Sequence, residues 1–196
     1  VRTEIREITG KVEEVQHVST GKAQELEQTI TALKSRVPPP PGIPEELLAS
    51  DEERIGSNNS AAAELYKSGL QAIRVGDFET ARTKFDSFVS SNPGTAYTDN
   101  ALFWSGMASQ HANQLDRAVV SYSEVFQKYP AEDMVPPALY YLAEVFVKNG
   151  SKKDAVLPLQ KLVDEYSRSP YASRGRALLQ EISGGASKKK PVAKSR

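Results

Sequence analysis

The sequence predicts an all-α fold, an α-solenoid in which three helical hairpins stack side by side and a cap helix closes the array. Segments of one residue pattern begin at Gly76, Asn113 and Gly150, so the chain repeats with a period of 37 residues. Within each segment, apolar residues recur three and four positions apart, which is the spacing of one face of a helix. A fixed period with helical patterning in every unit is typical of helical repeat arrays.

Small residues predict where the two helices of each unit cross. Antiparallel helices that pack closely need small side chains at the crossing point, with large side chains filling the space on either side. Two positions of the repeat carry only glycine or alanine. They are Gly69, Gly106 and Ala143 in the first helices and Ala81, Ala118 and Ala155 in the second helices.

Glycine and proline predict where the helices end. Gly76 and Gly150 follow the first helices of units one and three, as glycine does past a helix C-terminus, and Asn113 takes that place in unit two. Pro93 and Pro130 end the second helices of units one and two.

Pro158 does not fit this pattern, because it falls inside the predicted second helix of unit three. There it removes a backbone hydrogen bond and is expected to kink the helix, at a cost of about 3 kcal/mol relative to alanine. The segment from Ser169, "SPYASRGRALLQEIS", has the pattern of a cap helix.

The chain divides into four zones. Residues 1–37 have helical periodicity, 38–60 form an acidic linker that opens with "PPPPGIP", 61–183 hold the repeats, and 184–196 form a basic tail. Four successive prolines favour a stiff polyproline II spacer. The tail has no apolar periodicity and is expected to be disordered, either as a solvated end or as a contact for an anionic partner.

Residues 1–37 predict a coiled coil through which the chain associates with itself as a trimer, since β-branched residues occupy both seam positions of its first half. Gly10, Gly21 and a four-residue stutter between the two halves weaken the expected association. A single amphipathic helix lying on another surface is the alternative. The seam residues are Ile5, Ile8, Val12 and Val15, followed by Leu26, Ile30, Leu33 and Val37.

Composition and motifs argue against several functional classes. The chain has 25 Lys and Arg against 25 Asp and Glu, and it has no cysteine. Because positive and negative charges balance, the chain has no overall positive potential that would attract nucleic acid. Without cysteine, there are no disulfides or thiolate metal sites. His17 and His111 lack ligand spacing, no catalytic or phosphate-binding motif occurs, and no apolar run reaches the roughly 18 residues of a membrane helix. The sequence therefore predicts a non-enzymatic protein without cofactor, metal or membrane span.

The first helices of stacked hairpins line the concave side of an array, so their residues predict a peptide-binding groove there. Exposed aromatic and apolar rows favour the apolar stripe of a partner peptide, and a basic rim favours acidic groups beside it. A one-residue error in helix phase, which would place some of these residues in the core, is the alternative. The three rows are Tyr66, Phe103 and Tyr140; Leu70, Met107 and Glu144; and, at the rim, Arg74, His111 and Lys148.

The pattern "L…G…GDF..A...F..F....P" of unit one resembles the tetratricopeptide repeat, whose usual period is 34 residues. The three units, the joining stretches "NPGTAYTDNALFWSGMA" and "YPAEDMVPPALYYLAEVF", the proline-rich linker and the short coiled coil together resemble the YbgF/CpoB family over residues 1–183. This resemblance implies a periplasmic protein of a Gram-negative bacterium whose signal peptide has been removed. It also implies TolA and the peptidoglycan synthesis machinery as partners, in coordinating outer-membrane constriction with wall synthesis at division.

Two other classes stay open. An outer-membrane assembly lipoprotein of similar repeats would carry a lipidated cysteine and more repeats. A cytosolic adaptor that grips a peptide carboxylate would need Lys, Arg and Asn along the inner face of the array, which here is mostly aromatic and apolar.

Overall fold

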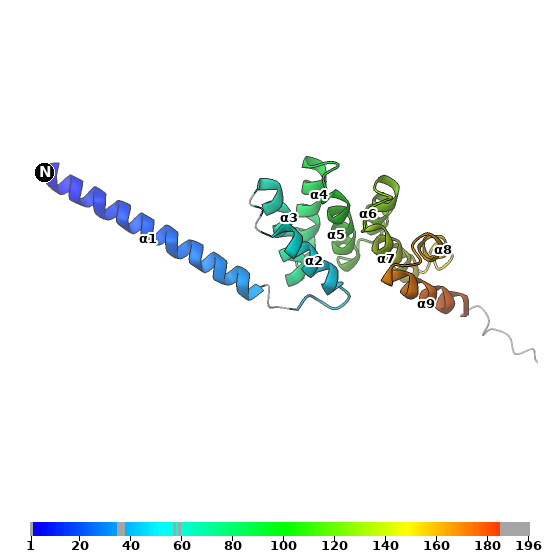
Figure 1. The fold of residues 1–196 in the computed structure, drawn as a ribbon. Helices are drawn as coiled ribbons and strands as arrows, with labels where there is room; N and C mark the ends of the chain where they lie inside the picture. The colour runs from blue at the N-terminus through cyan, green and yellow to red at the C-terminus, as the bar shows by residue number, and fades with distance from the viewer. Residues whose placement is uncertain (1, 35–37, 57, 59, 185–196) are drawn as a thin grey trace, which may run out of the picture.

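The computed structural model describes residues 2–34, 38–56, 58 and 60–184. Over these residues the secondary structure is helical, with nine α-helices and no strand (Figure 1). The helices are α1 (Arg2–Lys34), α2 (Glu45–Ile55), α3 (Ala61–Val75), α4 (Phe78–Ser91), α5 (Thr98–His111), α6 (Leu115–Lys128), α7 (Val135–Lys148), α8 (Val156–Glu165) and α9 (Pro170–Gly184).

The predicted solenoid is confirmed. Helices α3 and α4, α5 and α6, and α7 and α8 form three hairpins, each packed against the next, and α9 packs against α7 and α8 as the cap helix (Figure 1). The first helices of the units therefore line one side of the array, and the second helices line the other.

The predicted helix ends are also confirmed. Gly76, Asn113 and Gly150 have φ values of 78°, 60° and 81°, so all three adopt the left-handed conformation that ends a helix. Asp77 follows Gly76 directly, and its side chain caps α4 by accepting a hydrogen bond from the Thr80 backbone N–H.

The small residues lie where the helices of each hairpin cross. A Cβ atom added at Gly69 would lie 2.7 Å from the ring of Phe85, and one added at Gly106 would lie 2.7 Å from the ring of Tyr122. The equivalent partner of Ala143 in unit three is Leu159, and both are fully buried. Glycine therefore faces an aromatic ring in units one and two, and alanine faces a smaller leucine in unit three.

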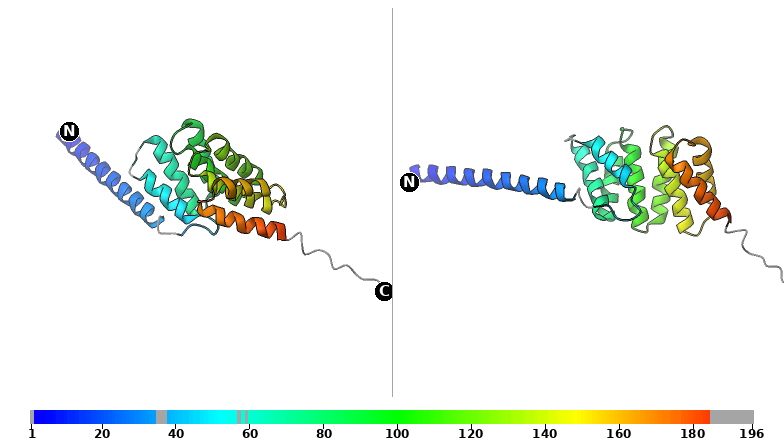
Figure 2. Two further views of the ribbon diagram at one scale, coloured as in Figure 1. Left: turned by 45° about the vertical axis from the view of Figure 1, so that its right-hand side comes forward. Right: turned by 60° about the horizontal axis from the view of Figure 1, so that its bottom comes forward.

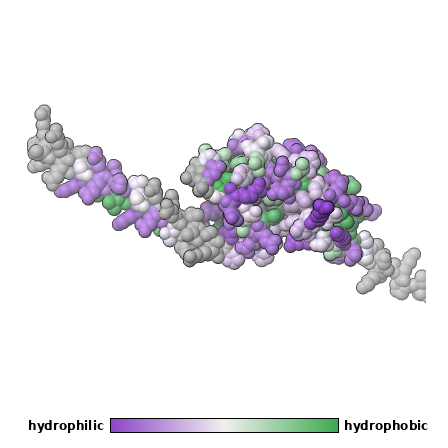
Figure 3. Space-filling view, viewed as in Figure 1, coloured by the Kyte–Doolittle hydropathy of each residue, from purple (hydrophilic) through white to green (hydrophobic). Residues whose placement is uncertain are grey.

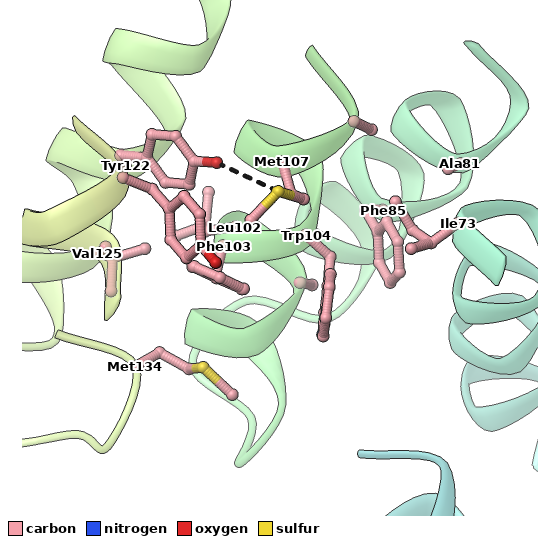
Figure 4. Packing of buried hydrophobic residues seen from close by; sticks show 14 of the residues in the cluster. Ile73, Ala81, Phe85, Leu102, Phe103, Trp104, Met107, Tyr122, Val125 and Met134 are labelled. Carbon is pink, nitrogen blue, oxygen red and sulfur yellow. Dashed lines mark hydrogen bonds between the residues drawn. The ribbon is translucent and has the colours of Figure 1, made fainter. Parts of the chain in front are cut away.

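Helix α5 lies at the centre of the core. Phe103 and Trp104, which are neighbours in sequence, leave different sides of α5, and Tyr122 of α6 packs beside Phe103 (Figure 4). The Tyr122 hydroxyl contacts the Met107 sulfur at 3.8 Å. Every residue of α5 from 98 to 109 is buried.

The expected kink at Pro158 is wrong. Helix α8 begins only at Val156, so Pro158 lies in its first turn, where a backbone N–H has no partner within the helix. The proline therefore removes no hydrogen bond from the helix interior.

The linker predicted over 38–60 is not a spacer throughout, because it contains α2. Helix α1 projects away from the repeats (Figures 1 and 2). The surface of α1 is mostly hydrophilic with a small apolar patch (Figure 3). Among the described helices, none combines the length and the apolar character that crossing a membrane requires. The predicted basic tail from residue 185 onward lies outside the described residues.

Candidate protein-binding groove and the helix that fills it

Helix α2 lies across the first helices of units one and two (Figure 2, right). It buries one stripe, formed by Leu48, Asp51 and Ile55, whose spacing of three and four residues matches one face of a helix. We call the surface beneath it the inner groove, defined by Tyr66 and Arg74 of α3 and Asn100 and Trp104 of α5.

Asp51 is the polar centre of the contact, and it is fully buried. Its Oδ2 accepts hydrogen bonds from the Tyr66 hydroxyl at 2.5 Å and from the Trp104 indole N–H at 2.6 Å. Its Oδ1 accepts one from Asn100 Nδ2 at 2.8 Å. Burial raises the pKa of Asp51, although the three donors and nearby Arg54 oppose the shift.

Two ion pairs at the edges of the inner groove hold the rest of the contact. Arg74, which is buried, forms a bidentate pair with Glu52, with Nη2 2.6 Å from Oε2 and Nε 2.9 Å from Oε1. Two residues after Glu52, Arg54 Nη1 lies 3.3 Å from Asp133 Oδ2. The Tyr97 hydroxyl donates to the Arg54 backbone carbonyl at 3.1 Å. Charge complementarity therefore fixes the position of α2 along the groove.

The chain that precedes α2 also contacts the array. A Cβ atom added at Gly42 would lie 3.2 Å from His111 Cε1. The His111 ring stacks on Phe78 with centroids 4.7 Å apart. Burial and the charge of Lys148 lower the pKa of His111, against a hydrogen bond with the Gly42 backbone. Two of the predicted rim residues, Arg74 and His111, thus contact residues 42–52 of the same chain.

Most of the predicted groove residues are not exposed, and in this respect the prediction is wrong. Tyr66, Leu70, Phe103 and Met107 are fully or almost fully buried, and Arg74 is buried as well. The first helices of units one and two pack against their own second helix and the neighbouring unit, and α2 covers the remaining side. Whether these residues bind a partner stays a prediction.

In unit three, two of the predicted residues, Tyr140 and Glu144, are half-buried, and Lys148 is exposed. The Tyr140 ring lies 5.7 Å from that of Tyr171 on the cap helix, and burial raises the pKa of Glu144 beside it. Lys148 Nζ donates to the Gln110 backbone carbonyl at 3.3 Å. This part of the concave side therefore packs against α9 and α5.

The prediction missed the residues that hold α2, namely Asp51, Asn100 and Trp104. A signal for them exists in the sequence, because Leu48, Asp51 and Ile55 have helical spacing within the acidic stretch. Because four prolines precede this stretch, the prediction assigned all of it to the linker.

A cluster of carboxylates lies at the N-terminus of α5. Asp99, Glu132 and Asp133 each place a carboxylate oxygen within 4.8 Å of the others, the one such group of potential metal ligands among the described residues. Burial first, and then the charges of Asp133 and Glu132, raise the pKa of Asp99 to about 6. Arg54 balances part of this charge through its ion pair with Asp133.

On the opposite side of the array, a cleft of about 430 Å³ lies between α4 and α6, with α5 as its floor. Its lining combines ionic and hydroxyl groups, such as Arg82, Asp86 and Ser105, with the exposed side chain of Val120. This mixed lining differs from the inner groove, which contacts the apolar side chains and carboxylates of α2.

The predicted seam residues lie on α1 as far as they are described. Val12, Val15 and Leu26 are 48%, 67% and 61% exposed. The side chains of Ile5, Ile8, Ile30 and Leu33, and the whole of Val37, lie outside the described residues. Self-association through this helix stays a prediction.

Comparison with known proteins agrees with the architecture. Residues 53–181 match the family described as a tetratricopeptide repeat-like domain. The outer membrane protein assembly factor BamD of Pasteurella multocida (strain Pm70) is 26% identical over 137 residues, which cover 61% of this chain and 53% of BamD. The chain thus spans about half the length of this curated relative.

Solved structures show the same fold at low identity. PcrH, in complex with the chaperone binding region of PopB, has a TM-score of 0.53 and 19% identity, covering 63% of this chain and 98% of that one. A tetratricopeptide repeat protein from Parabacteroides merdae ATCC 43184 also has a TM-score of 0.53 and 19% identity, over 72% and 53%. A chain of the CopN–Scc3 complex has a TM-score of 0.52 and 18% identity, over 71% and 88%. Because the family match covers more than half of the sequence and the three hairpins repeat as that family requires, the chain belongs to the tetratricopeptide repeat-like family.

Proposed function

We propose that this protein is a periplasmic scaffold of the Tol-Pal system, which coordinates outer-membrane constriction with peptidoglycan synthesis during cell division. The observation that carries the proposal is the joining of a tetratricopeptide array, which is a protein-interaction scaffold, to a projecting helix with exposed apolar residues. The YbgF/CpoB family has the same order of coiled coil, proline-rich linker and repeats.

In this proposal α1 gathers several repeat domains into one trimer. The exposed Val12 and Val15 lie three residues apart, and Leu26 continues the apolar positions further along the helix. Gathering the repeat domains raises their effective concentration at a partner such as TolA, so that a weak contact per repeat domain becomes a strong one per trimer.

A second function is favoured by one observation, the sequence similarity to BamD. In that case the repeat domain serves an outer-membrane protein assembly machinery. The shared length is about half of BamD.

Deletion of the gene in its own bacterium, with two readouts, separates the two functions. The Tol-Pal role is expected to give chained cells with delayed outer-membrane constriction and unchanged amounts of outer-membrane β-barrel proteins. Loss of β-barrel proteins with normal constriction would instead support the second function. Re-expression of the wild-type gene is the control for both readouts.

A further inference from the structure

Helix α2 has the features of a bound ligand more than those of an independent helix. It has only 11 residues, and its N-cap residue, Pro44, provides no side-chain hydrogen bond. Isolated helices of this length are marginal in water, so α2 depends on the inner groove for its structure. It carries five acidic residues and one arginine, and it meets Arg74 at the groove.

The inner groove has the features of a recognition site. Three neutral donors from α3 and α5 converge on one carboxylate, and a buried arginine grips a second carboxylate one residue further along the helix. Apolar contacts through Leu48 and Ile55 flank this polar centre. A buried polar centre of this kind selects one register and one chemistry, because a helix without the carboxylate leaves the three donors unpaired.

We propose, as an extension of the scaffold role, that the inner groove is the partner-binding site and that α2 occupies it in cis. The occupant in the bound state is an acidic amphipathic helix of a partner protein. Its pattern is an apolar residue, an aspartate three positions on, an acidic residue next, and an apolar residue four positions after the aspartate. Binding requires that α2 leaves.

The contacts of α2 suit an exchangeable element. Among the described residues, two of its three ion pairs with the array have an exposed carboxylate, Glu45 with Arg74 and Asp133 with Arg54, and exposed pairs contribute little to stability. The third, the Arg74–Glu52 pair, has a buried arginine and a half-buried carboxylate. A cleft of about 390 Å³ remains between α2 and α3, lined by Glu52, Lys67 and Leu70 among others. The polar centre makes the inner groove selective for its occupant, and the incomplete packing beside it allows α2 to leave.

Competition between the cis helix and an added peptide tests the proposal. The probe is a fluorescein-labelled peptide of residues 42–58, titrated into the full chain and followed by fluorescence anisotropy. In the wild type the tethered α2 competes at an effective concentration of about millimolar order. The full-chain variant Leu48→Ala/Asp51→Ala weakens α2 alone, and it is expected to bind the peptide at least tenfold more tightly than the wild type.

Two controls define the result. Ser50→Ala/Glu53→Ala changes two exposed positions of α2 and is expected to leave the wild-type affinity unchanged. The labelled peptide that carries Asp51→Ala is expected to bind the Leu48→Ala/Asp51→Ala chain, which we call the released chain, at least tenfold more weakly than the wild-type peptide does. A folded Leu48→Ala/Asp51→Ala chain that binds the peptide no better than the wild type overturns the proposal.

A second measurement covers the case in which that variant does not fold. A protease site inserted between residues 57 and 60 of the otherwise wild-type chain is cut after folding, which leaves the α1–α2 fragment bound without a tether. Excess unlabelled peptide is expected to release this fragment on size-exclusion chromatography. Retention of the fragment at millimolar peptide would show that α2 is a permanent part of the fold.

Titration with TolA of the same organism separates this inference from the Tol-Pal assignment. If the peptide binds the released chain and TolA binds neither chain, the groove stands and only the Tol-Pal assignment fails. If TolA binds both chains equally and the peptide binds neither, the scaffold role stands and the groove proposal is rejected.

Discussion

Asp51 shows how one residue can hold two elements together at a cost in desolvation. The carboxylate is fully buried between α2 and the inner groove, and its three donors only partly offset the loss of water. The side-chain oxygen of Asn100 is also buried and accepts no hydrogen bond among the described residues. An amide at position 51 can therefore replace the carboxylate, if the Asn100 amide turns over and its oxygen accepts the new N–H.

We expect Asp51→Asn to change the free energy of unfolding by less than about 1 kcal/mol, because the Tyr66 and Trp104 donors keep an acceptor and the new amide N–H pairs with the Asn100 oxygen. The one unpartnered atom of the Asn100 amide then changes from its oxygen to its nitrogen. Asp51→Ala leaves Tyr66, Trp104 and Asn100 without an acceptor and is expected to destabilise the chain by about 3 kcal/mol or more. Urea unfolding followed by circular dichroism measures both. Equal losses in the two variants would contradict the hydrogen-bond argument.

Asp99 predicts an unusual pH dependence, because it is only 3% exposed and its pKa is raised to about 6. The unfolded pKa is about 4, so the folded chain binds more protons between these values and gains stability as the pH falls through 6. At pH 7.5 we expect Asp99→Asn to be more stable than the wild type by roughly 1 to 3 kcal/mol. The difference should shrink towards zero near pH 4.

Thermal unfolding of both chains between pH 4 and 8 measures this difference. The pKa of His111 is lowered, so its contribution falls on acidification below about 6.5, but it is common to both chains and cancels. Asp154→Asn, at an exposed aspartate, is the matched control. A constant difference at all pH values would show that the charge of Asp99 is not its source.

At the scale of the helices, the crossing of each hairpin depends on a pair of residues. Gly106→Ala gains about 1 kcal/mol in helix propensity but drives a methyl group into the Tyr122 ring, and overpacking costs about 1 to 3 kcal/mol. We expect a net loss of stability for this variant. Gly106→Ala/Tyr122→Leu recreates the Ala143–Leu159 pair of unit three, so it should lose at least about 1 kcal/mol less than the sum of the single variants.

Chemical unfolding of the two single variants and the double variant measures this coupling. Gly10→Ala on α1 is the control, because no atom lies within 4 Å of its added Cβ and the propensity gain acts alone. If the losses of unfolding free energy in the two single variants add up to that of the double variant, positions 106 and 122 are not energetically coupled.

The sequence predicted the elements whose signals are local. The repeat period predicts the hairpins, and it predicts a helix end at Asn113, which takes the place that glycine has in units one and three. The kink predicted at Pro158 is wrong because α8 begins later than the repeat pattern indicates. The start of α8 depends on the turn before it, and the repeat pattern contains no signal for that turn. The inner groove could not be predicted from periodicity, because the burial of Tyr66 and Phe103 depends on how helices from different units and α2 pack together.

At the scale of the whole molecule, α1 makes the protein multivalent if its apolar residues pair. Val12→Lys/Val15→Lys places two charges on the exposed seam and is expected to reduce the sedimenting mass from trimer to monomer at micromolar concentration. His17→Lys, at an exposed position of α1 on the side away from the seam, is the control. Monomeric wild-type chain at high concentration would contradict self-association through α1.

The contact between Trp104 and Asp51 has an optical consequence. Trp104 is the single tryptophan of the chain, and its indole N–H donates directly to the helix that fills the inner groove. Departure of α2 would expose this indole to water while the rest of α5 remains in place. The intrinsic emission of the unlabelled protein should then shift to longer wavelength before any helical signal of the repeats is lost, so the chain carries its own spectroscopic reporter of an open groove.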